Sequence, residues 1–413
     1  MAGETTKSGA VGAAAACGVR PSAQRPITPM KCTMFLLTIV SLLAGQSFFN
    51  TQGLGELMHA SDAQSVALAA PHALSNWNPG MLVVLPQTRI SFTGLGAVSI
   101  ARRNSLTRAV GNLRPSGVWG VTPLPCGFRF SLSLFERFNQ DFDIWTESTA
   151  TTPYWYHIVS RGGIYTLGAN LTASLLNHLG LGLGYNRTVG GSREDWNFIT
   201  GDNRYRSTDT IELNWSGSML LGGVSFQHPY FVVATVFEPT HTLQGRRFKR
   251  VHGAVSDTEQ LFTIRLPLTI SVGASIQVNR KLCFQLGAER RPWAKSLLNN
   301  STWRRLRDVW RLSLGLELNL IEEHPLRLGY AHDDWYFWNE LPNTPEPSPI
   351  LEHSLHWGTS FPIRRFGTTD LAIALAMRKN RTPAGTMYEE AFKMSVTLAY
   401  SEAWLKRTRR WGY

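Results

Sequence analysis

The chain has 413 residues and a formal net charge of +12. Its 14 tryptophans, 11 tyrosines, 20 phenylalanines and 36 glycines accompany a slightly negative mean hydropathy. This composition excludes a bundle of membrane-spanning helices, which needs runs of about 20 apolar residues. A membrane-spanning β-barrel fits it, because every second residue of a spanning strand can be polar.

The excess of basic residues lies in short runs near 246–250, 304–307 and 406–410. Such runs raise nucleic acid as a partner. In a barrel, however, the phosphates of lipopolysaccharide are the nearer counter-charge. We therefore expect outer-membrane lipid and lipopolysaccharide as partners, together with the barrel-assembly machinery, and no nucleic acid.

The first segment with a recognisable pattern is the apolar run 32–45, which follows Lys31. It is too short to span a membrane as a helix and has the length of a signal-peptide core. We expect a signal peptide over 30–46 with Met30 as the initiator. Residues 1–29 would then be an extension that is not translated; the alternative is a long first region of the signal peptide.

Residues 47–85 do not alternate and are rich in small residues. They are predicted to form a hatch that plugs the barrel lumen, although a free leader is the alternative. Asn78, Pro79 and Gly80 form the sharpest turn signal of the segment, because Asn-Pro and Pro-Gly are both turn dipeptides. We assign them to the hatch; an ordinary turn before the first strand is the other interpretation.

Residues 86–400 alternate between apolar and polar side chains along most of their length. The longest faultless stretch, Phe262–Val278, has nine apolar residues on one side. As a single strand it would span ~56 Å at about 3.3 Å per residue, and a tilted strand that crosses a bilayer accounts for that length. Pro267 lies within it and donates no hydrogen bond, so either a local kink or wall gap, or a bulge, is expected there.

Counting the alternating stretches predicts fourteen strands, an even number that leaves both barrel ends in the periplasm. Short turns alternate with longer polar links, which are expected to be outer loops. These links are 139–153, 188–207, 239–259, 291–305, 332–351 and 379–388. The fold class is therefore all-β, a transmembrane antiparallel up-and-down β-barrel of about 14 strands with an N-terminal luminal hatch. Residues 401–413 would be a basic periplasmic tail, and the location is the bacterial outer membrane.

Two cysteines, Cys126 and Cys283, remain after removal of the signal peptide. Their spacing matches no metal site, and whether they form a disulfide is left open.

Several short motifs resemble the FadL family of hydrophobic-compound transporters, which includes long-chain fatty-acid and toluene-type importers. The resemblance implies a hatch, fourteen strands, ligand entry from the outer loops and exit sideways through a gap in the wall, without a cofactor. Gly80 departs from the family pattern, which has alanine there, and so does the tail after Tyr400. The motifs are Ala67-Leu68-Ala69-Ala70, Asn78-Pro79-Gly80-Met81, Leu266–Gly273 and Arg327–Asp334.

The alternation also predicts which charged side chains point into the lumen. Arginines there could hold an anionic headgroup through paired hydrogen bonds. The alternative is a structural ladder of Arg–Glu pairs. The residues are Arg129, Arg161, Glu212, Arg265, Arg311, Glu317, Arg327 and Lys393.

Four consecutive aromatic residues, Trp335, Tyr336, Phe337 and Trp338, fall in an expected outer loop. They are predicted to form either a landing surface for an apolar ligand or part of the aromatic girdle at the lipid interface.

The sequence thus favours passive uptake of small hydrophobic molecules, fatty-acid-like or aromatic, without cofactor or metal. Alternatives are a polar porin, or a barrel that acts as scaffold or shuttle for secreted proteins, like the FadL-related barrel of type IX secretion. An enzyme is not expected, since no glycine-rich phosphate loop links a strand to a helix.

Overall fold

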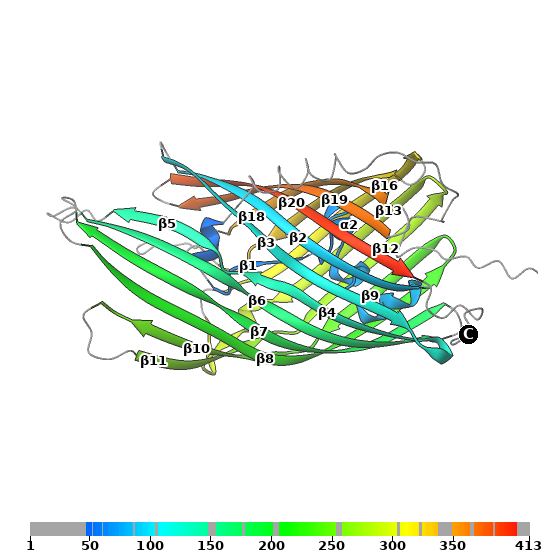
Figure 1. The fold of residues 1–413 in the computed structure, drawn as a ribbon, viewed down its shortest axis with the longest axis horizontal. Helices are drawn as coiled ribbons and strands as arrows, with labels where there is room; N and C mark the ends of the chain where they lie inside the picture. The colour runs from blue at the N-terminus through cyan, green and yellow to red at the C-terminus, as the bar shows by residue number, and fades with distance from the viewer. Residues whose placement is uncertain are drawn as a thin grey trace, which may run out of the picture.

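The structure is a computed structural model, shown in Figure 1. It describes residues 47–402 apart from 52, 60, 86, 104–105, 148–153, 176–177, 201–205, 253–257, 304–305, 322–323, 338–348, 364–366 and 383–384. The predicted signal peptide (30–46) and the extension before it lie outside the described residues, as does the chain after Glu402.

Antiparallel strands form a closed wall, because the last strand pairs with the first from Thr88↔Glu402 to Arg103↔Met387. Closure pairs backbone groups that would otherwise face lipid without a hydrogen-bond partner. The wall strands are β2 (Thr88–Arg103), β3 (Leu106–Pro123), β4 (Phe128–Asn139), β5 (Phe142–Glu147), β6 (Tyr154–Leu175), β7 (Leu179–Thr200), β8 (Arg206–His228), β9 (Phe231–Glu238), β10 (His241–Arg250), β11 (Thr258–Leu266), β12 (Thr269–Asn279), β13 (Leu282–Pro292), β16 (Asp308–Ile321), β17 (His324–Asp334), β18 (Leu351–Ile363), β19 (Gly367–Thr382) and β20 (Gly385–Glu402).

Three pairs of consecutive strands, β4 with β5, β9 with β10 and β11 with β12, are each one wall strand with an interruption. Strands β4 and β5 both pair with β6, β9 and β10 both pair with β8, and β11 and β12 lie along β10 and β9. The described wall therefore has fourteen strands, which confirms the predicted barrel. No helix among the described residues is long and apolar enough to cross a membrane.

The wall is apolar outside and polar inside, the reverse of a soluble protein. Leucines such as Leu167, Leu183 and Leu314 are exposed on the outer surface, while Thr172 and Ser271 are buried towards the lumen. This arrangement is typical of a barrel whose outside meets lipid.

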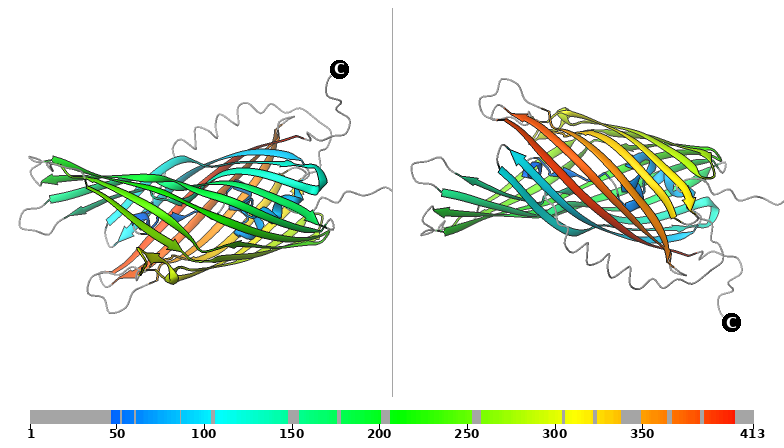
Figure 2. Two further views of the ribbon diagram at one scale, coloured as in Figure 1. Left: turned by 90° about the horizontal axis from the view of Figure 1, so that it is seen from below. Right: turned by 90° about the horizontal axis from the view of Figure 1, so that it is seen from above.

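Three of the six expected outer loops, 188–207, 239–259 and 379–388, are mostly strand, so that part of the prediction is wrong. Strand β7 continues to Thr200, β8 begins at Arg206, and the link expected at 239–259 contains β10. Figure 2 shows β6, β7 and β8 extending beyond the rest of the wall. Charged residues in these stretches favour a loop in the sequence pattern, but strands that rise out of the bilayer into water can carry polar residues on both faces.

The expected seventeen-residue strand is also wrong, because Pro267 and Leu268 separate β11 from β12. Ile264 and Leu266 are buried inside the barrel, whereas Ile270 and Val272 are exposed outside. The side chains thus change faces at the break. The neighbouring strand is interrupted at the same level, between β9 and β10 at Pro239, and neither proline can donate to a ladder.

The N-terminal segment 47–85 lies inside the barrel (Figure 1) and crosses the lumen. Helix α2 contacts β17 to β20, and η3 contacts β6 to β9 on the facing wall. The elements of the N-terminal segment are η1 (Phe48–Thr51), β1 (Glu56–Leu57), α2 (Ala63–Ala67), η2 (His72–Leu74) and η3 (Pro79–Val84). The remaining short elements are η4 (Pro125–Gly127), η5 (Trp293–Lys295), β14 (Leu297–Leu298) and β15 (Ser301–Thr302).

Candidate functional site

The predicted hatch residues lie in the lumen at the start of η3. Asn78 is fully buried, and its Oδ1 accepts a hydrogen bond of 2.8 Å from the backbone N–H of Gly80. Its amide nitrogen donates to the carbonyls of Ala73 at 2.7 Å and Thr235 at 3.3 Å. One asparagine side chain therefore shapes the turn and ties it to β9.

Inward-facing glycines of β7 and β8 form the seat of this turn. A Cβ atom at Gly182 would lie 2.6 Å from the nitrogen of Gly80, and one at Gly223 would lie 2.7 Å from it. A Cβ atom on Gly80 itself would lie 2.7 Å from the carbonyl carbon of Gly223. Backbone thus packs directly on backbone, which explains why Gly80 occupies the position where the resembling family has alanine.

Hydroxyl groups of the wall add hydrogen bonds to the same turn. Ser225 donates to the carbonyl of Gly80 at 2.7 Å, and Thr172 donates to the carbonyl of Pro79. Further round the barrel, more inward-facing glycines contact the segment at Leu74, Pro71 and Ala67–Leu68. These glycines are Gly273, Gly287, Gly315, Gly329 and Gly358.

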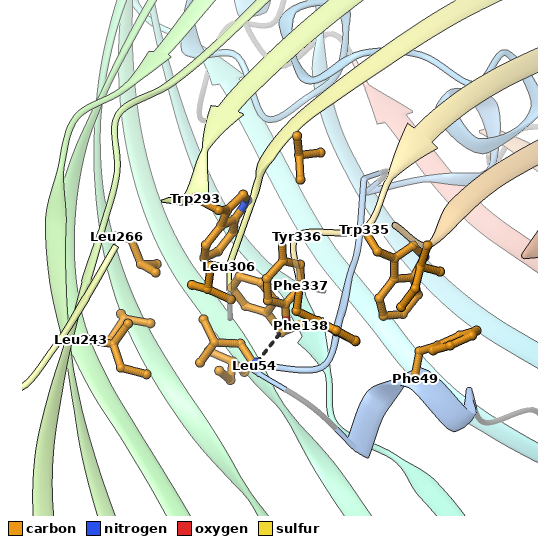
Figure 3. Packing of buried hydrophobic residues seen from close by; sticks show 14 of the residues in the cluster. Phe49, Leu54, Phe138, Leu243, Leu266, Trp293, Leu306, Trp335, Tyr336 and Phe337 are labelled. Atoms are coloured by element: carbon orange, nitrogen blue, oxygen red, sulfur yellow. Dashed lines mark hydrogen bonds between the residues drawn. The ribbon is translucent and has the colours of Figure 1, made fainter. Parts of the chain in front are cut away.

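The outer part of the segment packs into an aromatic cluster (Figure 3). The rings of Trp293 and Tyr336 stack with centroids 4.6 Å apart, and those of Phe49 and Trp335 lie 5.5 Å apart. The Tyr336 hydroxyl accepts from the N–H of Leu54 at 2.7 Å and donates to the carbonyl of Gly55 at 2.7 Å. Other members are Phe138, Ile164, Trp215, Leu243, Ile264, Leu266, Leu306, Val309, Phe337, Ile350 and Met387.

Beside this cluster, Glu56 of β1 is held by charged residues of the wall. Its carboxylate is bound by Arg378 and Lys393, and Arg378 also binds Glu352 at 2.6 Å and Glu389 at 2.5 Å. These cations, despite the opposing effect of burial, lower the pKa of Glu56 to about 2. The carboxylate is therefore a charged anchor of the N-terminal segment.

Two histidines of the segment lie among arginines. His59 Nε2 is 2.6 Å from Asp333 Oδ2, and His72 Nδ1 is 3.3 Å from Glu289 Oε2. Burial, assisted by nearby arginines that include Arg291, lowers the pKa of both histidines well below its usual range. Burial therefore disfavours the charged form of both imidazoles in the docked segment.

The wall has a gap between β3 and β4. The β3–β4 ladder runs from Pro123↔Arg129 to Gly117↔Phe135, and among the described residues β3 has no β4 or β5 partner beyond it. Strand β1 takes the place of β3 there, pairing Leu57 with Phe138. The N-terminal segment thus completes the sheet at the gap.

Side chains also bridge this gap. Arg114 of β3 binds Glu136 of β4 at 2.7 Å and Asp141, in the break between β4 and β5, at 3.2 Å. Asn112 donates to Asp141 as well. The gap is therefore closed by a polar latch where the backbone ladder is missing.

The N-terminal segment crosses the lumen and packs against facing parts of the wall. Cavities of about 40 Å³ and about 10 Å³ border the segment, lined by residues that include Ser65 and Leu82 in the first and His59 and Trp77 in the second. Such volumes hold one or a few waters. Within the described residues, no three His, Cys, Asp or Glu side chains are grouped so as to hold a metal ion.

The inward orientation predicted for most charged residues agrees with the structure. Arg129 donates to the carbonyl of Leu85 at 2.9 Å, and Arg311 donates to the carbonyls of Ala69 and Ala70 at 3.3 Å. Glu317 and Arg327 bind each other at 2.7 Å, and Lys393 binds Glu56. These five residues therefore contact the protein itself.

Arg265, Arg161 and Glu212 face outward, so their predicted position in the lumen is wrong. Ile264 and Leu266 on either side of Arg265 are buried in the aromatic cluster, which leaves Arg265 on the outer surface. For Arg265 the cause is the change of face at Pro267, because the alternation of the sequence continues through the break while the backbone turns over.

The predicted surface patch is also placed differently. Trp335, Tyr336 and Phe337 are buried in the lumen, neither exposed as a landing surface nor part of a lipid-facing girdle. They fold inward because burial removes their rings from water and gives the Tyr336 hydroxyl two partners. Trp338 lies outside the described residues. Cys126 is free and exposed, so it does not pair with Cys283.

Several residues of this site were not predicted, although the sequence held a signal for some. Arg378 lies on the face of the alternating alanines of β19, two residues past the last of them, and extending the pattern would have found it. The sequence shows the all-glycine face of 179–185. That these glycines seat the turn at Gly80 becomes clear only when the N-terminal segment is placed against them. Glu56 and Arg114 carried no local signal.

The fold and site define a class: a closed fourteen-stranded barrel whose N-terminal segment lies in the lumen and pairs with a strand beside a wall gap. Comparison with protein-family models found no match, and neither did comparison with curated proteins.

Comparison with solved structures shows which known barrels this fold resembles. The crystal structure of a Pseudomonas aeruginosa FadL homologue superposes with a TM-score of 0.59 at 13% identity, covering 84% of this chain and 99% of that one. The Pseudomonas putida toluene transporter TodX gives 0.58 at 12% identity, covering 85% and 99%. The chain therefore has the FadL-type barrel fold.

Proposed function

We propose that this protein is an outer-membrane channel for passive uptake of small hydrophobic molecules. The hypothesis has two supports outside the site. The similar folds include a protein described as a toluene transporter. The barrel exterior is apolar, as membrane insertion requires.

The observation that carries the proposal is the position of the aromatic cluster beside the wall gap. Phe138 belongs to the cluster and lies on β4 where the ladder to β3 has ended. Leu57 of β1 packs against the same cluster and pairs with Phe138. An apolar molecule that replaced part of the N-terminal segment in this cluster would lie next to an exit into the membrane.

In this mechanism the segment is the hatch and β1 is its movable part. An apolar solute gains about 25 cal/mol for each Å² of surface that it buries in the cluster. That gain offsets the free energy lost when Phe49 separates from Trp335 and Leu54 separates from Tyr336. Separation of β1 from β4 and opening of the Arg114 latch then free the gap. No bond is made or broken, and the protein is not an enzyme.

Uptake in whole cells tests the function. The protein is produced in an outer-membrane-competent host that lacks its own hydrophobic-compound channel, and initial uptake of labelled toluene, a long-chain fatty acid and glycerol is measured. We expect faster uptake of one or both hydrophobic compounds and unchanged glycerol uptake, because the N-terminal segment crosses the lumen and packs on facing parts of the wall.

Conductance of the purified protein in planar bilayers separates the alternatives. A lumen that is plugged by the seated N-terminal segment should give almost no ion current. Large steady conductance with no hydrophobic uptake would establish a polar porin instead. If the protein shows no uptake and no conductance, that result would contradict a channel of any kind and favour a scaffold for secreted proteins.

A further inference from the structure

The outer surface of β7, β8, β10 and β11 carries an uncommon row of polar side chains. Arg187 pairs in register with Ser218, Thr242 lies beside Ser218, and Thr242 pairs with Arg265. All four are exposed, while the alternate residues Asn186 and Leu243 are buried inside. Strands lie about 4.8 Å apart, so the two arginine Cα atoms are separated by about 14 Å.

The row is the first polar row above the apolar band of the wall. One step closer to the turns, Tyr185 and Leu220 are exposed apolar side chains on the same surface, and Phe237 and Ile270 follow in the next row. The row runs obliquely, because Arg187 is eight residues beyond the start of β7 at Leu179, whereas Arg265 is fourteen residues before the end of β12 at Asn279. With the short turns facing the periplasm, it rises from the upper edge of the apolar band into the outer-leaflet headgroups. Arginine on a lipid-facing wall is disfavoured at the bilayer centre and tolerated at this level.

The chemistry of the row and of the wall just above it is positive and rich in hydrogen-bonding groups. Above it lie Ser216, Gln244 and Thr263, together with the exposed Val189 on β7. Among the described residues, neither Arg187 nor Arg265 has an acidic partner. Two outward acids, Glu212 on β8 and Glu259 on β11, lie six residues higher along their strands, and Glu259 is paired with Arg246. Two guanidinium groups without a counter-charge, with hydroxyls between them, match a ligand with two separated phosphates on a polyhydroxyl body.

We propose that this row binds an outer-leaflet lipid whose headgroup is a sugar phosphorylated at both ends. Arg187 and Arg265 each hold one phosphate, Ser218 and Thr242 face the sugar between them, and the acyl chains lie against the apolar band below. Arg265, which the sequence pattern placed in the lumen, becomes a lipid contact because of the change of face at Pro267. The site is on the outside of the barrel, so it stands independently of the proposed uptake.

Binding of bisphosphorylated lipid A to the purified full-length protein tests the site. The protein is titrated in detergent and bound lipid is counted by native mass spectrometry. The test variant is Arg187→Gln/Arg265→Gln, and the matched control is Arg290→Gln, an exposed outward arginine of β13 beside Trp310. Heat-dependent gel migration confirms that each variant is a folded barrel.

We expect the double variant to bind at least about tenfold more weakly, which corresponds to about 1.4 kcal/mol. The control variant should bind like the natural protein, and lipid A without its phosphates should bind both the natural protein and the double variant weakly. Equal binding by the double variant would overturn the proposal, as would equal binding of the dephosphorylated lipid. Displacement of lipid A by millimolar inorganic phosphate would show a free-phosphate site and would also overturn it.

Discussion

The two halves of the N-terminal segment are attached to the barrel in different ways. The inner half, Ala63–Val84, meets the wall through glycines such as Gly182 and Gly223, so its backbone lies on the backbone of the strands. The outer half, Phe49–His59, is held by the two-residue ladder of β1 with β4 and by long side chains, among them Tyr336 and Arg378.

This difference separates a fixed part from a movable one. Backbone packed on glycine has no side chain that can rotate away, so the inner half stays seated or leaves as a unit. Side-chain contacts of the outer half break one at a time at a cost of a few kcal/mol each or less. The outer half is therefore the part that opens in the proposed mechanism.

The largest effect is expected from Gly182→Val, which removes the seat of the inner half. The added side chain would overlap the backbone of Pro79 and Gly80 and displace the turn. We expect steady ion conductance in planar bilayers where the natural protein has almost none. The control is Gly222→Val on β8, where an added Cβ atom has no neighbour closer than 4.0 Å. Equal conductance of the two variants would contradict the glycine seat.

A smaller, local effect is expected from Glu56→Gln in the outer half. The change leaves Lys393 and one nitrogen of Arg378 without their carboxylate partner, at a cost of about 3–5 kcal/mol when such a pair is buried. Hydrogen exchange measured by mass spectrometry should speed up in residues 49–59 and stay unchanged in 63–84. Glu390→Gln, which breaks an exposed pair with Arg102, is the control and should change neither. Faster hydrogen exchange in both halves would contradict the separation of the N-terminal segment into a fixed inner half and a movable outer half.

Acid should loosen the junction between the halves, where His59 and His72 lie. Their pKa values are lowered in the docked segment, whereas released histidines have the ordinary value of 6.5. The released state then binds more protons, so docking weakens as the pH falls below 6.5. Brief channel openings should become more frequent between pH 6.5 and pH ~5. His59→Gln/His72→Gln should flatten this dependence; an unchanged profile in that variant would assign it to other groups.

The smallest effect is expected from Tyr336→Phe. The change removes one hydroxyl that accepts from Leu54 and donates to Gly55, worth about 1 kcal/mol. Exchange of the Leu54 amide should rise by a factor of about five, with the inner half unaffected. Tyr330→Phe, whose hydroxyl contacts His353 on the outer surface, should leave the Leu54 amide unchanged. No change in the Tyr336 variant would mean that ring packing alone holds this contact.

The barrel could be predicted from the sequence because its signal is local. Alternation along single stretches such as 310–320 reports which residues face lipid, and the count of stretches gives the number of strands. The reversal at Pro267 was not predictable in the same way, since the apolar pattern continues through the break while the backbone turns over.

The site depended on contacts between distant parts of the chain. Glu56 and Arg378 are 322 positions apart, and their pairing follows from closure of the barrel around the segment. The sequence predicts an exposed position for Trp335, Tyr336 and Phe337. It does not show that Phe49 and Leu54 of the N-terminal segment contact these aromatic residues. The glycine face of β7 was visible in the sequence but acquired its meaning only with Gly80 against it.

A pair of engineered disulfides tests the central claim that the outer half moves while the inner half stays. Leu57→Cys/Phe138→Cys joins register partners of β1 and β4, and Ala73→Cys/Ser271→Cys ties the inner half to β12. Both are made with Cys126→Ser, which removes the exposed free thiol. Uptake of labelled toluene is compared before and after reduction. The account predicts that the outer disulfide blocks uptake until it is reduced and that the inner one has no effect. Full uptake with the outer disulfide closed would contradict it.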